Sequence, residues 1–280
     1  MDPNIITNTD VVQLPSSVIV IAVSCHGIFD LDTPTELDTL SKGPTFSFIK
    51  AIQAMNEKLT GKTPKVTLFD VIILAKDLQG NQAKIENSIK HYGLPISRCW
   101  FFNNEEFTQS LKSTNAKLFL SMDSSDVCKA LQEGVPAALL CPQTQAEGDK
   151  EQVANPFKVL LSGDVMGLPE EKLSEAGLSQ PQLQTFKAAK ASMAEFAAVI
   201  REMRRHFARE DSPLRVTLMS VLGSSKEWAS ALLTARGLGL EVDEAYCLAG
   251  ASSGPILNCI QPHIMCYDGL YSVTEVPALS

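Results

Sequence analysis

The stretch Val18-Ile19-Val20-Ile21-Ala22-Val23 and its counterpart Phe157-Lys158-Val159-Leu160-Leu161 decide the predicted fold. Both are short, nearly continuous apolar runs, which is typical of strands buried on both faces of a sheet. The first run leads into Ser24-Cys25-His26 and the second into Ser162-Gly163-Asp164. An irregular segment and then an amphipathic helix follow each of them. This order predicts an α/β fold with parallel strands.

The two halves of the chain continue on one plan. In each half, the amphipathic helix has a single apolar stripe. It is followed by a second strand, a helix closed by glycine, a third strand, a short helix and a fourth strand. The stripes are Phe48, Ile52, Met55, Leu59 and Met193, Phe196, Ile200, Met203, Phe207; the later strands are 69–74, 99–102, 118–123 and 214–219, 245–248, 263–268; the helix-closing glycines are Gly93 and Gly239.

Equal spacing supports an internal repeat. From Ala75 to Asp123 is 48 positions, and from Ser220 to Asp268 is also 48 positions. We therefore expect two tandem Rossmann-like parallel-sheet units related by a repeat. The expected organisation is a first unit at 1–141, a polar linker at 142–156 and a second unit at 157–280.

Composition narrows the function classes. Apolar residues make up 45% of the chain and charged residues 20%, the profile of a globular protein, and no apolar run approaches the ~18 residues of a membrane span. A formal charge of −8 argues against a nucleic-acid partner. The basic cluster Arg201, Arg204, Arg205 and Arg209 has helical spacing and predicts a solvated helix face. The first ten residues lack the pattern of a secretory signal, so we expect the cytoplasm and no membrane partner.

The seven cysteines fit that expectation. Their number is odd, and no pair has the spacing of a zinc site. Four of them lie in strand-like runs, where thiols are usually small buried apolar groups: Cys25, Cys99, Cys247 and Cys266.

Ligands of parallel sheets bind beyond the carboxyl ends of the strands. That rule selects the candidate residues: Ser24 to His26, Ala75, Asn103, Asn104 and Asp123 in the first half, and Ser162 to Asp164, Ser220, Ala251 to Gly254, Tyr267 and Asp268 in the second.

Five segments resemble the cytosolic 5'-nucleotidase I family of the haloacid-dehalogenase-like (HAD) phosphohydrolases, and the similarity covers nearly the whole chain. They are Gly43–Ala51 (GPTFSFIKA), Asn87–Tyr92 (NSIKHY), Gly239–Ala245 (GLEVDEA), Leu248–Ala251 (LAGA) and Pro262–Ile264 (PHI). The resemblance implies a HAD-like fold and a role in nucleotide metabolism. It also implies a catalytic second half, in which an Asp-Gly-Asp supplies an aspartate nucleophile and an acid/base aspartate.

The family pattern further implies a hydroxyl and an arginine after the second strand, a lysine before Gly254, and an acidic pair that holds Mg²⁺ after the fourth strand. This chain departs from that pattern. Ser162 stands at the nucleophile position, Leu222 replaces the arginine, Ser252-Ser253 replaces the lysine segment, and Tyr267-Asp268 keeps one carboxylate. Asp164 and Ser220 are retained.

These departures predict a pseudoenzyme with no assigned catalytic residue. A serine alcohol is a much weaker nucleophile than a carboxylate unless a base activates it, and a phosphoserine would not hydrolyse as an acyl-phosphate does. We expect Ser220, Ser252, Ser253 and Gly254 to be the phosphate-binding positions, and Asp164 and Asp268 to form a weak or lost metal site.

We expect action by binding, either of a nucleoside monophosphate or phosphate, or of a protein partner. The alternative is a weak or altered Mg²⁺-dependent 5'-nucleotidase, and only that alternative needs Mg²⁺ as a cofactor. A homo-oligomer, or a mixed oligomer with an active relative, is a further expectation drawn from the family.

Other side chains offer weaker chemistry. Cys25 and His26 are neighbours in an extended segment and point to opposite faces, so a vestigial strand end explains them better than a nucleophile–base pair. His263 follows Pro262 at a strand start and is expected to be structural. Gly250–Pro255 begins a short helix, whose amides could hold a phosphate without lysine.

Overall fold

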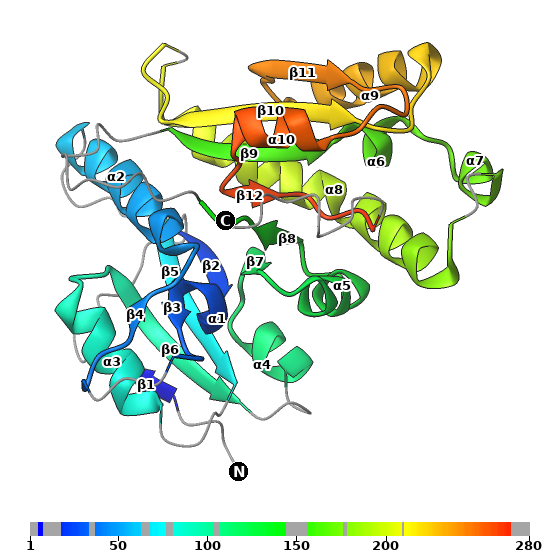
Figure 1. The fold of residues 1–280 in the computed structure, drawn as a ribbon. Coiled ribbons are helices and arrows are strands. Elements are labelled where there is room, and N and C mark those ends of the chain that lie inside the picture. The colour runs from blue at the N-terminus through cyan, green and yellow to red at the C-terminus, as the bar shows by residue number, and fades with distance from the viewer. Residues whose placement is uncertain are drawn as a thin grey trace. The chain divides into compact units, whose positions relative to one another are not determined.

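A computed structural model describes residues 5–7, 18–33, 37–62, 68–76, 81–102, 107–143, 156–175, 178–208 and 210–269 (Figure 1). The chain divides into two compact units, Met1–Met122 and Asp123–Ser280. Within the described parts, no helix combines the length and the apolar content needed to cross a membrane.

The first unit contains a mostly parallel sheet with the strand order β1-β6-β5-β2-β7. Its strands are β1 (Ile5–Thr7), β2 (Ile19–Ser24), β5 (Phe69–Lys76), β6 (Ile96–Phe102) and β7 (Leu118–Ser121). Only β1 runs antiparallel to its neighbour, β6. A separate two-stranded ribbon pairs β3 (Phe29–Asp30) with β4 (Ser41–Lys42). The helices are α1 (Cys25–Ile28), α2 (Phe46–Lys62), α3 (Gln82–His91) and α4 (Phe107–Ser113).

The second unit orders its strands β8-β12-β9-β10-β11. They are β8 (Ala137–Leu140), β9 (Phe157–Ser162), β10 (Leu214–Ser220), β11 (Glu244–Cys247) and β12 (Ile264–Met265). All pairs are parallel except β8 with β12. The helices are α5 (Ser124–Gln132), α6 (Gly163–Gly167), α7 (Glu170–Glu175), α8 (Gln180–Arg205), α9 (Ser225–Gly237) and α10 (Gly254–Ile260).

The predicted parallel α/β class is confirmed. In each unit the four strands expected from the apolar runs follow the spatial order third, second, first, fourth: β6-β5-β2-β7 in the first and β11-β10-β9-β12 in the second. That the two backbones superpose residue by residue, with Ser24 over Ser162, Ala75 over Ser220 and Asp123 over Asp268, stays a prediction.

The division between the units differs from the expected one at residue 141. Strand β8 pairs with β12, with Leu140 opposite Ile264, and α5 packs on α8. The side chains of Cys128 on α5 and Thr185 on α8 meet at 3.2 Å. Residues 123–141 therefore belong with the second sheet, because both of their packing partners come later in the chain. Of the expected linker, residues 144–155 lie outside the described residues.

Helix stripes and helix ends follow the sequence pattern. Every member of the two predicted apolar stripes is buried, on α2 and on α8 and its end. Gly93 and Gly239 have φ of +57° and +71°, so both provide the left-handed residue that ends a helix, as predicted.

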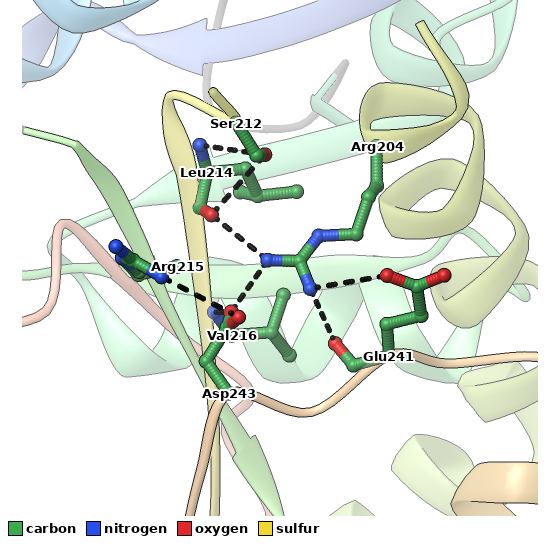
Figure 2. Close-up of polar contacts among 7 residues, drawn as sticks. All are labelled: Arg204, Ser212, Leu214, Arg215, Val216, Glu241 and Asp243. Carbon is green, nitrogen blue, oxygen red and sulfur yellow. Dashed lines mark hydrogen bonds and ion pairs between the residues drawn. The ribbon is translucent and has the colours of Figure 1, made fainter. Parts of the chain in front are cut away.

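Arg204 near the end of α8 is the centre of a buried polar cluster, shown in Figure 2. Its guanidinium donates to the carboxylate of Asp243 at 2.5 Å and to the carbonyl oxygens of Leu214 at 2.9 Å and Glu241 at 3.0 Å. Asp243 also accepts the Val216 amide at 2.8 Å and lies 3.6 Å from an Arg215 nitrogen. This cluster fastens α8 to the amino ends of β10 and β11.

The prediction of a solvated arginine face is therefore wrong at Arg204. Arg204 is 6% exposed, whereas the side chain of Arg205 is 65% exposed and pairs with Glu202 at 2.7 Å. Arg201 donates to the carbonyl oxygen of Leu238 from an exposed position, and Arg209 lies outside the described residues. Helical spacing alone could not separate one buried arginine from its solvated neighbours.

We expect Arg204→Met to lower the free energy of unfolding by about 3–5 kcal/mol, because it removes the buried cation bound to Asp243 and leaves that carboxylate with the half-exposed Arg215, at 3.6 Å, as its described cation. Arg205→Met, one residue away, is the matched control. Its free energy of unfolding should fall by no more than about 1 kcal/mol, because Arg205 belongs to an exposed ion pair. Urea denaturation of the two variants measures the difference. Equal losses would contradict a special role for the buried pair.

Candidate functional site

The candidate residues of the second unit gather where its parallel strands end. Ser162 is the last residue of β9 and Ser220 the last of β10, while Asp164 lies in α6 and Asp268 follows β12. All four are at most 1% exposed. The sheet edge predicted to carry the site thus contains a closely packed polar centre.

Ser162 and Asp268 form one pair within this centre. The Ser162 hydroxyl donates to Oδ2 of Asp268 at 2.5 Å and accepts the Val165 amide at 3.2 Å, which caps α6. The hydroxyl that the sequence analysis expects at the nucleophile position is therefore held as a helix cap. The retained carboxylate after the fourth strand is its acceptor.

Asp164 forms the second pair, with Ser220, and binds backbone as well. Its carboxylate accepts the Ser220 hydroxyl at 2.6 Å, the Val221 amide at 2.7 Å, the Gly223 amide at 3.0 Å and the Leu222 amide at 3.2 Å. The Ser220 hydroxyl in turn accepts the Gly223 amide at 3.2 Å. The turn 221–223 is thereby closed onto the side chain that stands at the acid/base position.

Sequence reasoning missed these three backbone amides as functional groups. A backbone donor leaves no mark in residue type, and the only available hint was Gly223. A Cβ there would lie 2.6 Å from Oγ of Ser220 and 3.5 Å from Oδ1 of Asp164, so the close approach requires glycine.

The donor set does not fit the Mg²⁺ that the family pattern implies. Mg²⁺ requires oxygen ligands with free lone pairs, usually one or two carboxylates. Here both oxygens of Asp164 face N–H and O–H donors, and Oδ2 of Asp268 accepts from Ser162. Across the described residues, no three His, Cys, Asp or Glu side chains are grouped as a metal site.

The remaining candidate positions of the second unit differ in their exposure. Ser253 is buried and Ser252 exposed, and Gly254 begins the seven-residue helix α10. Pro255 follows Gly254 and has no N–H, which reduces the amides that this helix start can offer. Leu222, at the arginine position, is 43% exposed. Tyr267 is half-buried, and burial raises the pKa of its phenol.

In the first unit the candidate strand ends show no comparable centre among the described residues. Cys25 is buried, and burial raises the pKa of its thiol far above the ordinary range, while the His26 ring is 59% exposed and lies 3.9 Å from Asp32. Ser24 is half-buried and Ala75 is buried. Asn103 and Asn104 lie outside the described residues.

Asp123, at the start of the second unit, has a structural role. Its side chain caps α5 by accepting the Ser125 amide at 2.8 Å. A capping carboxylate explains an aspartate at this strand end without a ligand.

The cysteine prediction is confirmed at three of four positions. Cys25, Cys99 and Cys266 are buried, and burial raises the pKa of both Cys99 and Cys266 to about 12. The prediction is wrong at Cys247, which is exposed on β11, the outermost of the described strands in its sheet. None of the buried thiols is poised as a nucleophile.

His263 is a buried structural residue at the amino end of β12, away from the strand ends that carry the candidate site. Its Nδ1 accepts the Lys158 amide at 3.1 Å, and its ring packs on Phe157. Burial, and next the nearby Lys158 ammonium, lower the pKa of His263 to about 4. The neutral imidazole is therefore part of the folded structure.

We expect acid to destabilise the protein through this ring. His263 takes up a proton below about pH 6.5 in the unfolded chain but only near pH 4 in the folded chain. The contribution of the neutral ring to the free energy of unfolding is therefore complete above about pH 6.5 and is lost as the pH falls toward 4. The loss should approach about 3 kcal/mol. His263→Asn keeps an acceptor for the Lys158 amide and does not titrate. Denaturation curves at pH 7 and pH 4.5 should show a smaller drop for the variant; equal drops would contradict the assignment.

Comparison with known proteins agrees with this geometry. The polar centre lies at the carboxyl edge of a parallel α/β sheet, which is where such folds bind ligands. A family profile described as 5'-nucleotidase matches residues 33–276. The chain belongs to the 5'-nucleotidase family, as the sequence resemblance predicted.

One relative of this chain is human cytosolic 5'-nucleotidase 1B. It is 28% identical over 249 residues, which cover 84% of this chain and 40% of the relative. The chain thus spans about two fifths of the length of the curated relative it matches.

Proposed function

We propose that this chain is a catalytically silent member of the 5'-nucleotidase family that acts by binding rather than by turnover. The observation that carries the proposal is the hydrogen bonding of the two positions on which the family chemistry depends. Ser162 donates its hydroxyl to Asp268, and Asp164 has both oxygens engaged by Ser220 and the turn 221–223.

The hydrogen bonding at each of these two positions removes one step of the family's phosphoryl-transfer reaction. Phosphoryl transfer to an aspartate needs a carboxylate nucleophile, and the hydroxyl of Ser162 would yield a phosphoserine instead. Leaving-group protonation needs a carboxyl that can face the substrate, whereas Asp164 is 1% exposed and faces backbone amides. Charge compensation is also reduced, because Leu222 and Ser253 stand where the family pattern has cations.

The ligand and partner follow from the same site. The name of the human relative identifies a 5'-nucleotidase of the cytosol, and we propose the same compartment and a nucleoside monophosphate or phosphate as the ancestral ligand type. A protein partner, including a second copy or an active relative in a mixed oligomer, is the further proposal for a chain that retains the fold without the chemistry.

We expect purified protein to release no Mg²⁺-dependent phosphate from AMP, IMP or CMP above a mock preparation. A phosphate-release assay at several enzyme concentrations measures this. Asp164→Asn is the diagnostic variant: turnover that scales with wild-type protein and disappears in Asp164→Asn would refute the proposal and establish the weak nucleotidase.

Restoring the missing groups together should restore Mg²⁺ and nucleotide binding. The variant combines Ser162→Asp, Leu222→Arg, Ser253→Lys and Tyr267→Asp. Its new carboxylate at 162 would face Asp268, whose oxygen now lies 2.5 Å from the serine hydroxyl, so a cation is needed to offset the repulsion. We expect measurable calorimetric heat for Mg²⁺ and for AMP in Mg²⁺, and none in the parent.

The matched control carries Asn in place of Asp at position 162, with the other three changes kept. It has nearly the same shape but lacks one charge, so its Mg²⁺ affinity should be clearly lower. A restored variant that melts cooperatively yet gains no affinity would indicate that the pocket has closed, and the binding function would then belong to the outer surface.

A further inference from the structure

We propose that the turn 220–223 is a preformed anion-binding nest and that Asp164 is its resident anion, occupying from within the chain the place of a small oxyanion such as phosphate or a carboxylate. The inference deepens the proposed function, on which it rests for the ancestral ligand type. It assigns to Asp164 the role of an internal occupant that keeps the site closed.

The donors of the nest converge on one carboxylate. Three successive amides, of Val221, Leu222 and Gly223, and the hydroxyl of Ser220 all donate to Asp164 over 2.6 to 3.3 Å. Successive backbone N–H groups that point into one concavity form a site for an anion. A phosphate presents the same kind of acceptor oxygens as a carboxylate, so the same donors suit both.

The nest is held in shape from its other side, independently of Asp164. The carbonyl oxygens of Ser220 and Val221 accept the amides of Leu248 and Gly250, at 2.8 and 2.6 Å. The Cys247 thiol lies 3.7 Å from the carbonyl oxygen of Gly223. Because the loop after β11 fixes the two peptide groups that carry the Val221 and Leu222 amides, these N–H groups should keep their direction when the Asp164 side chain is removed.

Charge favours an anion in this place. Within the described part of the chain, every hydrogen-bond partner of the buried Asp164 carboxylate is a backbone amide or a hydroxyl, so polar groups without a full charge stabilise it. Helix α9 begins directly after the turn, and its amino end adds positive potential. The Glu227 carboxylate caps that helix at Ser224 and is bound by Lys172 at 2.5 Å, so it is already engaged.

The consequence is a site that excludes external phosphate while Asp164 remains in place. Two anions cannot share one set of donors, and the turn packs too closely to admit a second. A Cβ on Gly163 would come within 3.1 Å of Cβ of Ser220, and one on Gly223 within 2.6 Å of its Oγ. Binding of an external oxyanion therefore requires that the Asp164 side chain leave.

Chemical rescue tests this directly. Asp164→Ala removes the carboxylate and leaves the donors, so sodium formate or inorganic phosphate should refill the nest and raise the melting temperature by about 2–4 °C over sodium chloride of equal ionic strength. Phosphate stabilises most folds by exclusion from their surface, so the quantity compared is the shift in the variant minus the shift in the wild type. This excess shift should be clearly positive for Asp164→Ala.

Asp268→Ala is the matched control. It also removes a buried carboxylate, but the amides of the turn 221–223 donate to Asp164 and not to Asp268, so formate should give no excess shift. An Asp164→Ala protein that folds without any anion-specific gain, or an equal gain in Asp268→Ala, would overturn the proposal.

Asp164→Asn decides the matter if the alanine variant does not fold. It keeps the shape of the side chain but turns an NH₂ toward the amide donors, so hydrogen exchange of the Val221, Leu222 and Gly223 amides should accelerate at least tenfold while the amides of β10 stay protected. Unchanged exchange would refute the resident-anion role. Both readouts are independent of nucleotide turnover, so they can fail while the catalytically silent function holds, and the reverse.

Discussion

A buried carboxylate has to be balanced by a cation or by hydrogen-bond donors, and the described partners of Asp164 in the second unit are of the second kind. The donors it recruits are the end of β10 and the turn that leads into α9. That turn, through its carbonyl oxygens, holds the loop after β11. Three successive elements at the sheet edge therefore meet around one side chain. Under the proposed function, the same hydrogen bonds keep this carboxyl from acting as an acid.

Much of the fold could be predicted from the sequence because its central elements are long or strongly periodic. The apolar stripes of α2 and α8 and the continuous runs of β5 and β10 carry clear signals. Strands β1 and β8 were not predicted, since segments of three and four residues have no measurable period, and both pair antiparallel with strands far along the chain. Arg204 could not be recognised as buried, because its spacing is that of its exposed neighbours. Its burial depends on Asp243, 39 positions away.

For the candidate site, sequence reasoning predicted the location and not the contacts. Ser162, Ser220 and Asp268 end or follow parallel strands, so their common position at one sheet edge follows from topology. Which oxygen meets which donor depends on the backbone of the turns. Gly223 allows its own amide and that of Leu222 to reach Asp164, and this close contact arises only in the folded chain. The second sheet also departs from the expectation that every strand is covered, as the exposed Cys247 of β11 demonstrates.

The position of β11 has a consequence for how the protein behaves at high concentration. Within the described residues, β11 has a neighbour on one side only, whereas its counterpart β6 is flanked by β5 and β1. A strand edge with unpaired backbone groups can template the addition of a foreign strand and so start aggregation. Here the edge is four residues long, begins with the exposed carboxylate of Glu244 and ends before the left-handed turn at Ala249 and Gly250. The short edge, its charged residue and the abrupt change of backbone direction together disfavour the addition of further strands to the sheet.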